Sequence, residues 1–323
     1  MRVCVLEGGR SSEHDVSLAG AATVRRALAE AGHEVLAVRL ERDGTWWHEG
    51  EEVVLRAGRG LLDADVVFPV LHGAYGEDGT VQGLLELLDV PYVGSGVMAS
   101  AVCLDKIVFK DLMSAKGMPQ VRYLAVTAGD PTPDVSELGL PVWVKPARMG
   151  SSVGISRVDR LEDLEAALAE AFTYDERVII EASASGVEVE CSVLGDHRDA
   201  RVSLPGEIVL AGGADWYDQE AKYTEGGMSL RVPAAISETA AERVRDLSLR
   251  AFHAAGCCGL ARVDFFVDGE TVLLNELNTM PGQTKTSVYG VLWERSGLPY
   301  VELVDELCRL AVARFERERA LRF

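Results

Sequence analysis

Hydrophobic positions along the chain alternate between short β-branched runs and longer amphipathic stretches. The runs Arg2–Leu6 and Val66–Val70 have the composition of buried strands, and Val16–Ala31 between them has helical spacing. Strand, glycine-rich turn and helix in this order are typical of an open α/β sheet, in which ligands lie at the strand ends. Residues 1–100 are therefore expected to form an N-terminal α/β domain.

The next segment, from about Ala101, has the pattern of a helix followed by a hairpin. The helix is expected over Asp105–Lys116, and strands at Leu140–Lys145 and Val153–Arg157 enclose a loop rich in glycine and serine. Two strands joined by such a loop are typical of an antiparallel hairpin. Residues 101–185 are expected to form a central domain in which this loop is a flap.

The rest of the chain, residues 186–323, is expected to form a larger third domain. It starts with the alternating run Val187–Leu194 and ends with helices over Ser287–Ser296 and Tyr300–Phe315. Residues 211–227 have neither helical nor strand periodicity and are rich in Gly, Asp and Tyr. This segment is either a mobile lid over a site or a plain disordered loop.

The composition supports several folded domains and limits the classes of partner. A chain of 323 residues exceeds what one core usually serves, and 48% hydrophobic residues suffice for several cores. The net charge of −19 argues against nucleic-acid and anionic-membrane partners, which are bound by clustered Lys and Arg. The lack of a long apolar stretch and the strand pattern at the start predict a cytoplasmic protein. Six scattered cysteines without a CxxC pair are expected to be buried free thiols.

The first glycine-rich turn carries a candidate ligand-binding carboxylate. Gly8 and Gly9 follow the first strand, but the third glycine and the spacing of a dinucleotide-binding fingerprint are missing. The turn instead places Glu13 just ahead of a helix. There the carboxylate either caps the helix or binds the ammonium group of a substrate.

The loop Lys145–Gly154 is a candidate phosphate-binding flap. It combines a lysine at a strand end with small residues whose backbone can approach phosphate oxygens closely. The lysine precedes the glycines, so the loop is not a Walker A sequence. A hairpin turn with a surface lysine explains this loop equally well.

Acidic and amide side chains in the last third of the chain form a candidate magnesium site. Residues 262–264 and 275–278 have the pattern of two neighbouring strands, on which Asp264, Glu276 and Asn278 share one face. Such oxygen ligands suit Mg²⁺, which takes its other ligands from water and nucleotide phosphates. Alternation on a solvent-facing sheet is the other explanation, but the apolar flanks indicate a buried sheet, where unpaired carboxylates are costly.

Together these motifs resemble those of the D-alanine:D-alanine ligases of the ATP-grasp superfamily. The resemblance follows the family's order over nearly the whole chain. The matching segments are Gly8–Glu13 with Val16–Leu18, His72-Gly73 with Gly76–Gly83, Pro91–Gly96, Asp105-Lys106, Val144–Pro146 with Gly150–Gly154, Tyr217-Asp218 with Glu220–Tyr223, Arg262–Asp264, and Asn275–Gly282. The resemblance implies a mixed α/β, three-domain ATP-grasp architecture, a homodimer, and ATP-dependent synthesis of D-alanyl-D-alanine for peptidoglycan.

The resemblance also implies where the nucleotide and metal bind. ATP would lie between the second and third domains, with lysines and flap serines at its phosphates and two glutamates at adenine and ribose. Two Mg²⁺ ions, which Mn²⁺ can replace, would be held by Asp264, Glu276 and Asn278. The residues implied for the nucleotide are Lys106, Lys145, Lys222, Ser151, Ser152, Glu181, Glu188 and Asn275.

For the substrates, the resemblance implies a D-alanyl phosphate intermediate that the amine of a second D-alanine attacks. Glu13 would bind the first ammonium group, and Arg262 with the N–H of Gly282 would stabilise the tetrahedral oxyanion. Ser287 would anchor the second carboxylate. The other residues implied are Ser151 and Tyr223, which complete a hydrogen-bonded triad with Glu13, and Val16 and His72, which border the first subsite.

Several features leave the acceptor and the function class open. Tyr223 favours an amine acceptor, because relatives that make D-alanyl-D-lactate replace this tyrosine, whereas 182–184 and 283–286 depart from the family pattern. The alternatives within the superfamily are ligases that make D-alanyl-D-serine, D-alanyl-D-lactate or a secondary-metabolite dipeptide. The alternatives from other classes are a nucleotide-binding regulator without catalysis and a nicotinamide oxidoreductase.

Overall fold

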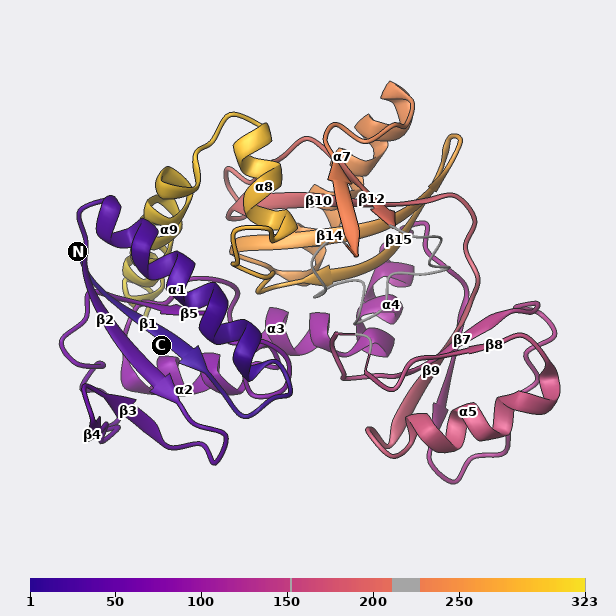
Figure 1. The fold of residues 1–323 in the computed structure, drawn as a ribbon, viewed down its shortest axis with the longest axis horizontal. Coiled ribbons are helices and arrows are strands. Elements are labelled where there is room, and N and C mark those ends of the chain that lie inside the picture. The colour runs from indigo at the N-terminus through magenta and orange to yellow at the C-terminus, as the bar shows by residue number, and fades with distance from the viewer. Residues whose placement is uncertain (152, 211–226, 323) are drawn as a thin grey trace.

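The computed structural model of the protein describes residues 1–151, 153–210 and 227–322. Within these residues the strands form three β-sheets, and helices pack against each sheet (Figure 1). The mixed α/β class predicted from the sequence is confirmed. The expected lid, residues 211–227, lies outside the described residues except for Gly227. Three predicted site residues also lie outside them, namely Ser152, Lys222 and Tyr223.

The first sheet is the open, largely parallel sheet that the sequence predicts. The strand β1 pairs in parallel with both β2 and β5, so the loops after β1 and β5 meet at one edge of the sheet. Helix α1 packs on one face and helix α2 on the other. In spatial order the strands are β4 (Glu51–Glu52), β3 (Trp46–His48), β2 (Glu34–Leu40), β1 (Arg2–Gly8) and β5 (Val66–Pro69), and the helices are α1 (His14–Glu30) and α2 (Thr80–Leu88).

The central sheet contains the predicted antiparallel hairpin. Strands β7 and β8 pair with Val142 opposite Val158. The expected strand at Val153–Arg157 is wrong at its start, because Ser151 and Gly154 have positive φ angles and keep this stretch in turns. In spatial order the strands are β6 (Tyr123–Thr127), β9 (Arg177–Ala182), β7 (Val142–Pro146) and β8 (Ser156–Val158), covered by η1 (Leu161–Asp163) and α5 (Leu164–Ala171).

The third sheet is antiparallel and places its inner face toward the other two units. Helix α7, which the sequence analysis did not identify, covers its outer face. The hydroxyl of Ser237 caps the start of α7 by accepting from Ala240 N, and Gly256 ends the helix in the left-handed conformation. The elements are β13 (Met228–Arg231), β12 (Gly206–Leu210), β10 (Val187–Gly195), β14 (Gly259–Asp268), β15 (Thr271–Asn278), the short β11 (Arg201–Val202), and α7 (Glu238–Ala255).

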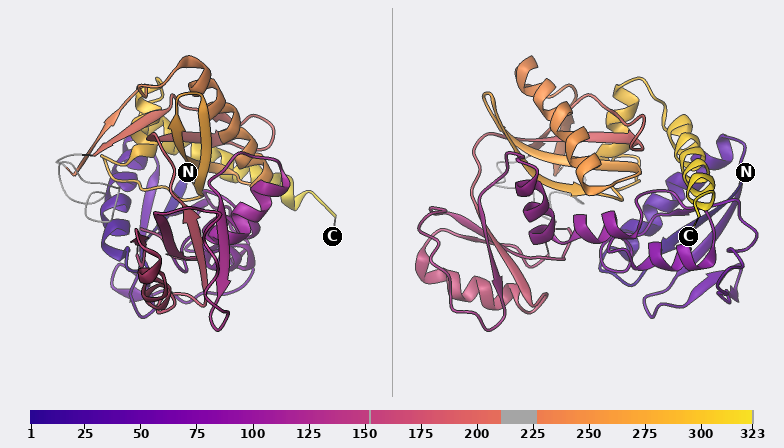
Figure 2. Two further views of the ribbon diagram at one scale, coloured as in Figure 1. Left: turned by 90° about the vertical axis from the view of Figure 1, so that its right-hand side faces the viewer. Right: turned by 180° about the vertical axis from the view of Figure 1, so that it is seen from behind.

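The last helix, α9 (Tyr300–Arg319), returns to the first sheet and lies beside α1 in the views of Figures 1 and 2. Leu303 and Leu307 share one hydrophobic core with Val3 and Val24. The remaining helices join the units, namely α3 (Val97–Leu104) and α4 (Lys106–Ala115) between the first and central sheets, and α8 (Val288–Arg295) before α9. The C-terminal end of the chain therefore completes the core of its N-terminal unit.

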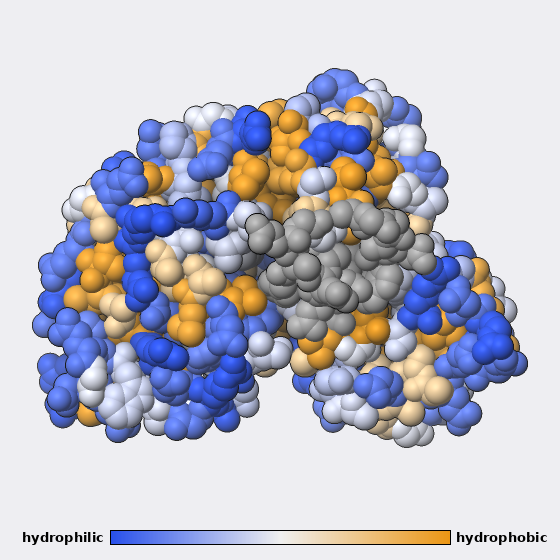
Figure 3. Space-filling view, viewed as in Figure 1, coloured by the Kyte–Doolittle hydropathy of each residue, from blue (hydrophilic) through white to orange (hydrophobic). Residues whose placement is uncertain are grey.

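The outer surface is mostly hydrophilic over the first and central units, and the outline is notched between them (Figure 3). In the part of the chain that the structure describes, no helix combines the length and apolarity needed to cross a membrane. All six cysteines are free, as predicted, and each is buried except the partly exposed Cys258.

Arg314 fastens α9 to the first unit from a buried position. Its Nη1 donates to the carbonyl of Gly94 at 2.5 Å and its Nη2 to the carbonyl of Tyr92 at 3.2 Å. The guanidinium also lies 4.4 Å from the centroid of the Tyr92 ring. Because two buried carbonyls depend on one side chain, this contact is sensitive to truncation.

We expect Arg314→Met to lower the free energy of unfolding by about 2–4 kcal/mol, because it leaves both carbonyls without their donor. Urea denaturation followed by circular dichroism measures this change. Arg309→Met on the same helix is the matched control, since Arg309 is largely exposed and, within the described part of the chain, its ion pair is with Asp305. Equal effects of the two substitutions would contradict the importance of the buried contacts.

Candidate active site

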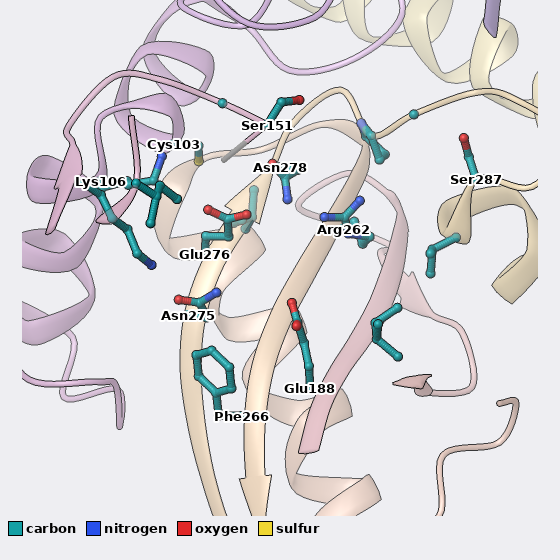
Figure 4. Close-up of a pocket in the computed structure, with 18 of the residues that line it drawn as sticks. Cys103, Lys106, Ser151, Glu188, Arg262, Phe266, Asn275, Glu276, Asn278 and Ser287 are labelled. Carbon is teal, nitrogen blue, oxygen red and sulfur yellow. The ribbon is translucent and has the colours of Figure 1, made fainter. Parts of the chain in front are cut away.

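A cavity of about 800 Å³ lies where the three units meet. Each unit contributes polar side chains to its wall, for example Glu13 from the first, Lys145 from the central and Glu276 from the third. Figure 4 shows Glu188, Arg262, Glu276 and others projecting from neighbouring strands of the third sheet into one space, with Lys106 and Ser287 on opposite sides of it. A pocket of this size with convergent charged groups is the expected form of a ligand site.

A β-bulge in β15 arranges the side chains on the cavity wall. Asp264 is paired with Glu276 but Phe265 is paired with Leu274, so Asn275 is the extra residue of the bulge. Side chains of a regular strand alternate between the two faces, and an extra residue shifts this alternation by one. Consequently Asn275 and Glu276, although adjacent, both line the cavity, and Asn278 follows on the same face.

Arg262 is held by carboxylates from two strands. Its Nε donates to Asp264 Oδ1 at 2.8 Å and its Nη2 to Asp264 Oδ2 at 2.7 Å. Glu190, which lies opposite Asp264 on β10, places Oε2 at 2.9 Å from the same Nε. The sequence analysis missed Glu190 because it belongs to no motif, although the alternation of Glu188 and Glu190 on one strand placed both on the same face.

The candidate metal ligands lie together on adjacent strands. Asp264 faces Glu276 across the ladder, and the Nδ2 of Asn278 donates to Asp264 Oδ2 at 3.1 Å. Among the described residues no three His, Cys, Asp or Glu side chains form a group that could hold a metal ion by themselves. Two carboxylates and an amide oxygen beside further acids are hard ligands that fit Mg²⁺.

Lysines from the central unit meet a buried glutamate at the cavity wall. Glu181 Oε2 lies 2.5 Å from Lys145 Nζ, and Oε1 lies 3.0 Å from Lys110 Nζ. Burial alone would raise the pKa of Glu181, but the two lysines outweigh burial and lower it to about 2. Lys106, at the start of α4, donates from Nζ to the carbonyl of Met149 at 2.6 Å and so contacts the flap. Lys110 has no place in the motifs and was missed by the sequence analysis.

Glu13 binds the flap instead of capping the helix. It occupies the N-cap position of α1, but its carboxylate makes no cap hydrogen bond. The hydroxyl of Ser151 donates to Glu13 Oε1, which joins the first unit to the flap. A Cβ on Gly73 would lie 2.9 Å from Glu13 Oε2, so only glycine fits this carboxylate in its present position. The alternative that Glu13 is only a helix cap is therefore wrong.

His72 and Glu77 lie beside Glu13 in the same wall. The Nδ1 of His72 lies 3.2 Å from the carbonyl of Met280 and donates to it, since a carbonyl oxygen only accepts. Burial lowers the pKa of His72, and the nearby Glu13 offsets part of this effect. Burial, reinforced by Glu13, raises the pKa of Glu77 to about 8, although Gly73 N donates to its Oε2 at 2.6 Å. Both side chains are therefore predominantly neutral at pH 7.

The far end of the cavity is formed by the turn before α8. Ser287 occupies the N-cap position of α8, and its hydroxyl accepts from Thr284 N at 2.9 Å. A Cβ on Gly282 would lie 2.8 Å from Ser287 Oγ, which explains a glycine at this position. Three further residues that the sequence predicts for the site also line the cavity, namely Val16, Glu188 and Asn275. No contact is described for Ser152, Lys222 and Tyr223, which lie outside the described residues.

We expect Glu77→Gln to change how stability depends on pH. The folded-state pKa of about 8 lies above the value of 4.5 for a free carboxyl, so folding binds a proton between these values. This contribution to stability is fully present below about pH 4.5 and is lost as the pH rises through about 8. The glutamine of Glu77→Gln cannot ionise. Between pH 5 and pH 9 the melting temperature of this variant should therefore fall by at least about 2 °C less than that of the wild type.

Differential scanning calorimetry of both proteins across this pH range measures the difference. Glu242→Gln, on the exposed side of α7, is the control and should follow the wild-type profile. Parallel profiles for wild type and Glu77→Gln would mean that Glu77 is ionised in the folded protein at pH 7.

Family models match most of the chain. The D-ala D-ala ligase N-terminus model matches residues 2–61 and 52–95, and the D-ala D-ala ligase C-terminus model matches residues 112–309. These two regions contain most of the residues that form the cavity wall, whereas Cys103, Leu104 and Lys106 lie between the regions.

Relatives and solved structures agree with the family models over the full length. The D-alanine–D-alanine ligase of Pseudarthrobacter chlorophenolicus is 46% identical, covering 97% of this chain and 94% of the relative. D-alanine–D-alanine ligase B of Bradyrhizobium diazoefficiens is 44% identical, covering 99% and 96%. The structure of the D-alanine-D-alanine ligase from Coxiella burnetii has a TM-score of 0.89 at 32% identity, covering 99% of this chain and 96% of that one. The VanG D-Ala:D-Ser ligase from Enterococcus faecalis has a TM-score of 0.84 at 32% identity, covering 96% and 99%. This chain belongs to the D-alanine–D-alanine ligase family.

Proposed function

We propose that this protein is an ATP-dependent ligase that joins two molecules of D-alanine into D-alanyl-D-alanine for peptidoglycan synthesis. The observation that carries the proposal is the meeting of three kinds of group in one cavity. These are the carboxylate of Glu13 from the first unit, lysines from the central unit, and an arginine among carboxylates from the third. Membership of the family supports the same reaction.

In the first step, a carboxylate oxygen of one D-alanine attacks the γ-phosphorus of ATP and displaces ADP. Glu13 is our candidate for the partner of the substrate's ammonium group, because its carboxylate already lies at the cavity wall. Lys106 and Lys145 are the candidates for contacts with the phosphates. The protein contributes orientation and compensation of charge, because phosphoryl transfer asks little covalent chemistry of it.

In the second step, the amine of another D-alanine attacks the acyl phosphate carbon, and the bond to phosphate breaks. The tetrahedral oxyanion requires donors that are already in place, and Arg262 and the N–H of Gly282 are our candidates. Ser287, at the start of α8, is placed where a helix N-terminus favours the carboxylate of the second substrate. Ser151 with Glu13, and Tyr223, are the candidates for the proton transfer from the incoming ammonium group.

We propose Mg²⁺, which Mn²⁺ can replace, as the metal, with Asp264, Glu276 and Asn278 as its protein ligands. When bound, the metal would neutralise phosphate charge and polarise the transferred phosphoryl group. The surplus of carboxylates around Arg262 supports this assignment, since a cation offsets the cost of keeping them together. The family resemblance further supports a homodimer in the cytoplasm.

A second candidate is a ligase with a different acceptor. One structural relative is a D-Ala:D-Ser ligase, whose TM-score of 0.84 is only slightly below the 0.89 of the D-alanine-D-alanine ligase from Coxiella burnetii. The cavity wall does not separate D-alanine from D-serine, because both acceptors attack through an amine. Tyr223, which bears on the choice between an amine and a hydroxy-acid acceptor, is not among the described residues. Product analysis separates them directly.

The purified protein is incubated with MgATP and D-alanine, with or without D-serine or D-lactate, and released phosphate and product mass are recorded. We expect phosphate release that depends on D-alanine, with D-alanyl-D-alanine as the main product. A mixed dipeptide or depsipeptide would keep the mechanism and change the acceptor. Absence of D-alanine-dependent phosphate release would contradict the proposed function.

We expect Glu276→Gln to reduce kcat by about 100-fold or more at saturating ATP, because it removes one anionic ligand of the metal. The magnesium concentration that gives half-maximal activity should rise. Circular dichroism should be unchanged. Glu270→Gln, in the exposed turn at the other end of the β14–β15 hairpin, is the matched control and should retain wild-type kinetics. Wild-type magnesium dependence in Glu276→Gln would refute the metal assignment.

A further inference from the structure

A second lysine lies behind the lysine that faces the cavity. Lys110 is 1% exposed, and its ammonium group lies 3.0 Å from Glu181 Oε1. Lys145, on the opposite side of the carboxylate, lies 2.5 Å from Oε2 and lines the cavity, whereas Lys110 does not. One buried carboxylate is therefore shared by a cation that faces the ligand space and a cation that is enclosed by protein.

The position of Lys110 follows from helix geometry. Lys106 and Lys110 are four residues apart on α4, so they lie on the same side of the helix, one turn apart. Asp105 caps this helix by accepting from Ile107 N and Val108 N, and it also pairs with Arg177 of β9 at 2.6 Å. The helix is thereby fixed against the strand that carries Glu181, and Lys110 has little freedom to leave it.

The net charge of Lys110, Lys145 and Glu181 affects how this part of the cavity can bind a polyanionic ligand. Glu181 with Lys145 alone would form a neutral pair, and a phosphate that drew Lys145 away would leave a buried carboxylate without a counter-ion. Breaking a buried pair in this way costs several kcal/mol. With Lys110 present, the group carries one net positive charge, and Glu181 keeps a partner whether or not Lys145 turns to a phosphate.

We propose that Lys110 is a positioning residue for the nucleotide, which holds and neutralises Glu181 so that Lys145 can transfer its ammonium group to the phosphates of ATP. This inference rests on the proposed ATP-dependent function. Lys110 touches no ligand itself and acts through Glu181.

The electrostatic environment agrees with this arrangement. Burial would lower the pKa of Lys145, but Glu181, Glu276 and Glu188 together outweigh it and raise that pKa above the usual value. Lys145 therefore stays charged, as a phosphate ligand must. The ring of Tyr123, with its centroid 5.7 Å from Lys110 Nζ, closes the other side of Lys110 with an aromatic face, which favours a cation.

The test measures binding of MgADP by calorimetric titration without D-alanine, together with kcat and both KM values. We expect Lys110→Met to weaken MgADP binding and raise the KM for ATP by about 10- to 100-fold, as expected for one truncated partner of a buried charge pair. The KM for D-alanine should stay within about twofold. Lys110→Arg should recover part of the affinity, because it keeps the charge. Lys116→Met, at the exposed C-cap of α4, is the matched control.

The double variant Lys110→Met/Glu181→Gln distinguishes positioning from a merely structural role. It should bind MgADP as tightly as Glu181→Gln alone, because Lys110 matters only while Glu181 is charged. This comparison also tests the proposal if Lys110→Met does not fold, since the double variant lacks both the charge of Lys110 and that of Glu181. Weaker binding by the double variant than by Glu181→Gln would overturn the proposal. A loss of stability in Lys110→Met with unchanged MgADP affinity would overturn it as well.

Failure of the proposed function has a different signature. If the wild-type protein binds MgADP but releases no phosphate with D-alanine, the ligase reaction is contradicted. The MgADP affinities of the variants then still decide whether Lys110 positions the nucleotide. A wild-type protein that does not bind MgADP overturns the inference itself.

Discussion

The cavity depends on one electrostatic constraint, namely that carboxylates gathered on neighbouring buried strands need cations close by. Asp264, Glu190 and Glu276 lie on three adjacent strands, and Arg262 is the protein cation held among them. Glu181 is enclosed by two lysines in the same way. The net charge of the whole chain is −19, so the positive charge that a polyphosphate requires has to be concentrated locally.

The three units contribute to this balance from different directions. The third sheet supplies the carboxylates and Arg262, α4 and the central sheet supply lysines, and the first unit supplies Glu13, which accepts a hydrogen bond from the flap at Ser151. Among the residues that the structure describes, no single unit supplies all of these groups. The site is therefore complete only while the units are packed against one another. Contacts between the units consequently affect activity as well as stability.

The sequence predicted the side chains that belong to recognisable motifs. It did not predict residues whose importance depends on a backbone irregularity or on contact with another residue. Glu13, Lys145, Asp264 and Glu276 were predicted because their residue types and spacing carry chemical meaning. The family resemblance supplied further candidate residues, including Lys106, Arg262 and Ser287, and all three line the cavity. Glu190 and Lys110 were missed, since a lone Glu or Lys in a regular element is ordinary until its burial and neighbours are known. The bulge at Asn275 was also hidden, because hydrophobic alternation along β15 does not show where an extra residue interrupts the ladder.

The return of α9 to the first sheet has a consequence for biosynthesis. The core that contains Val3 and Val24 also contains Leu303 and Leu307, which are synthesised long after the strands of the first sheet. The N-terminal unit therefore cannot bury its apolar face during most of translation, even though its strands and α1 emerge first. This apolar face lacks its native partner until α9 has been synthesised, so before that point the nascent N-terminal unit exposes a surface that favours aggregation.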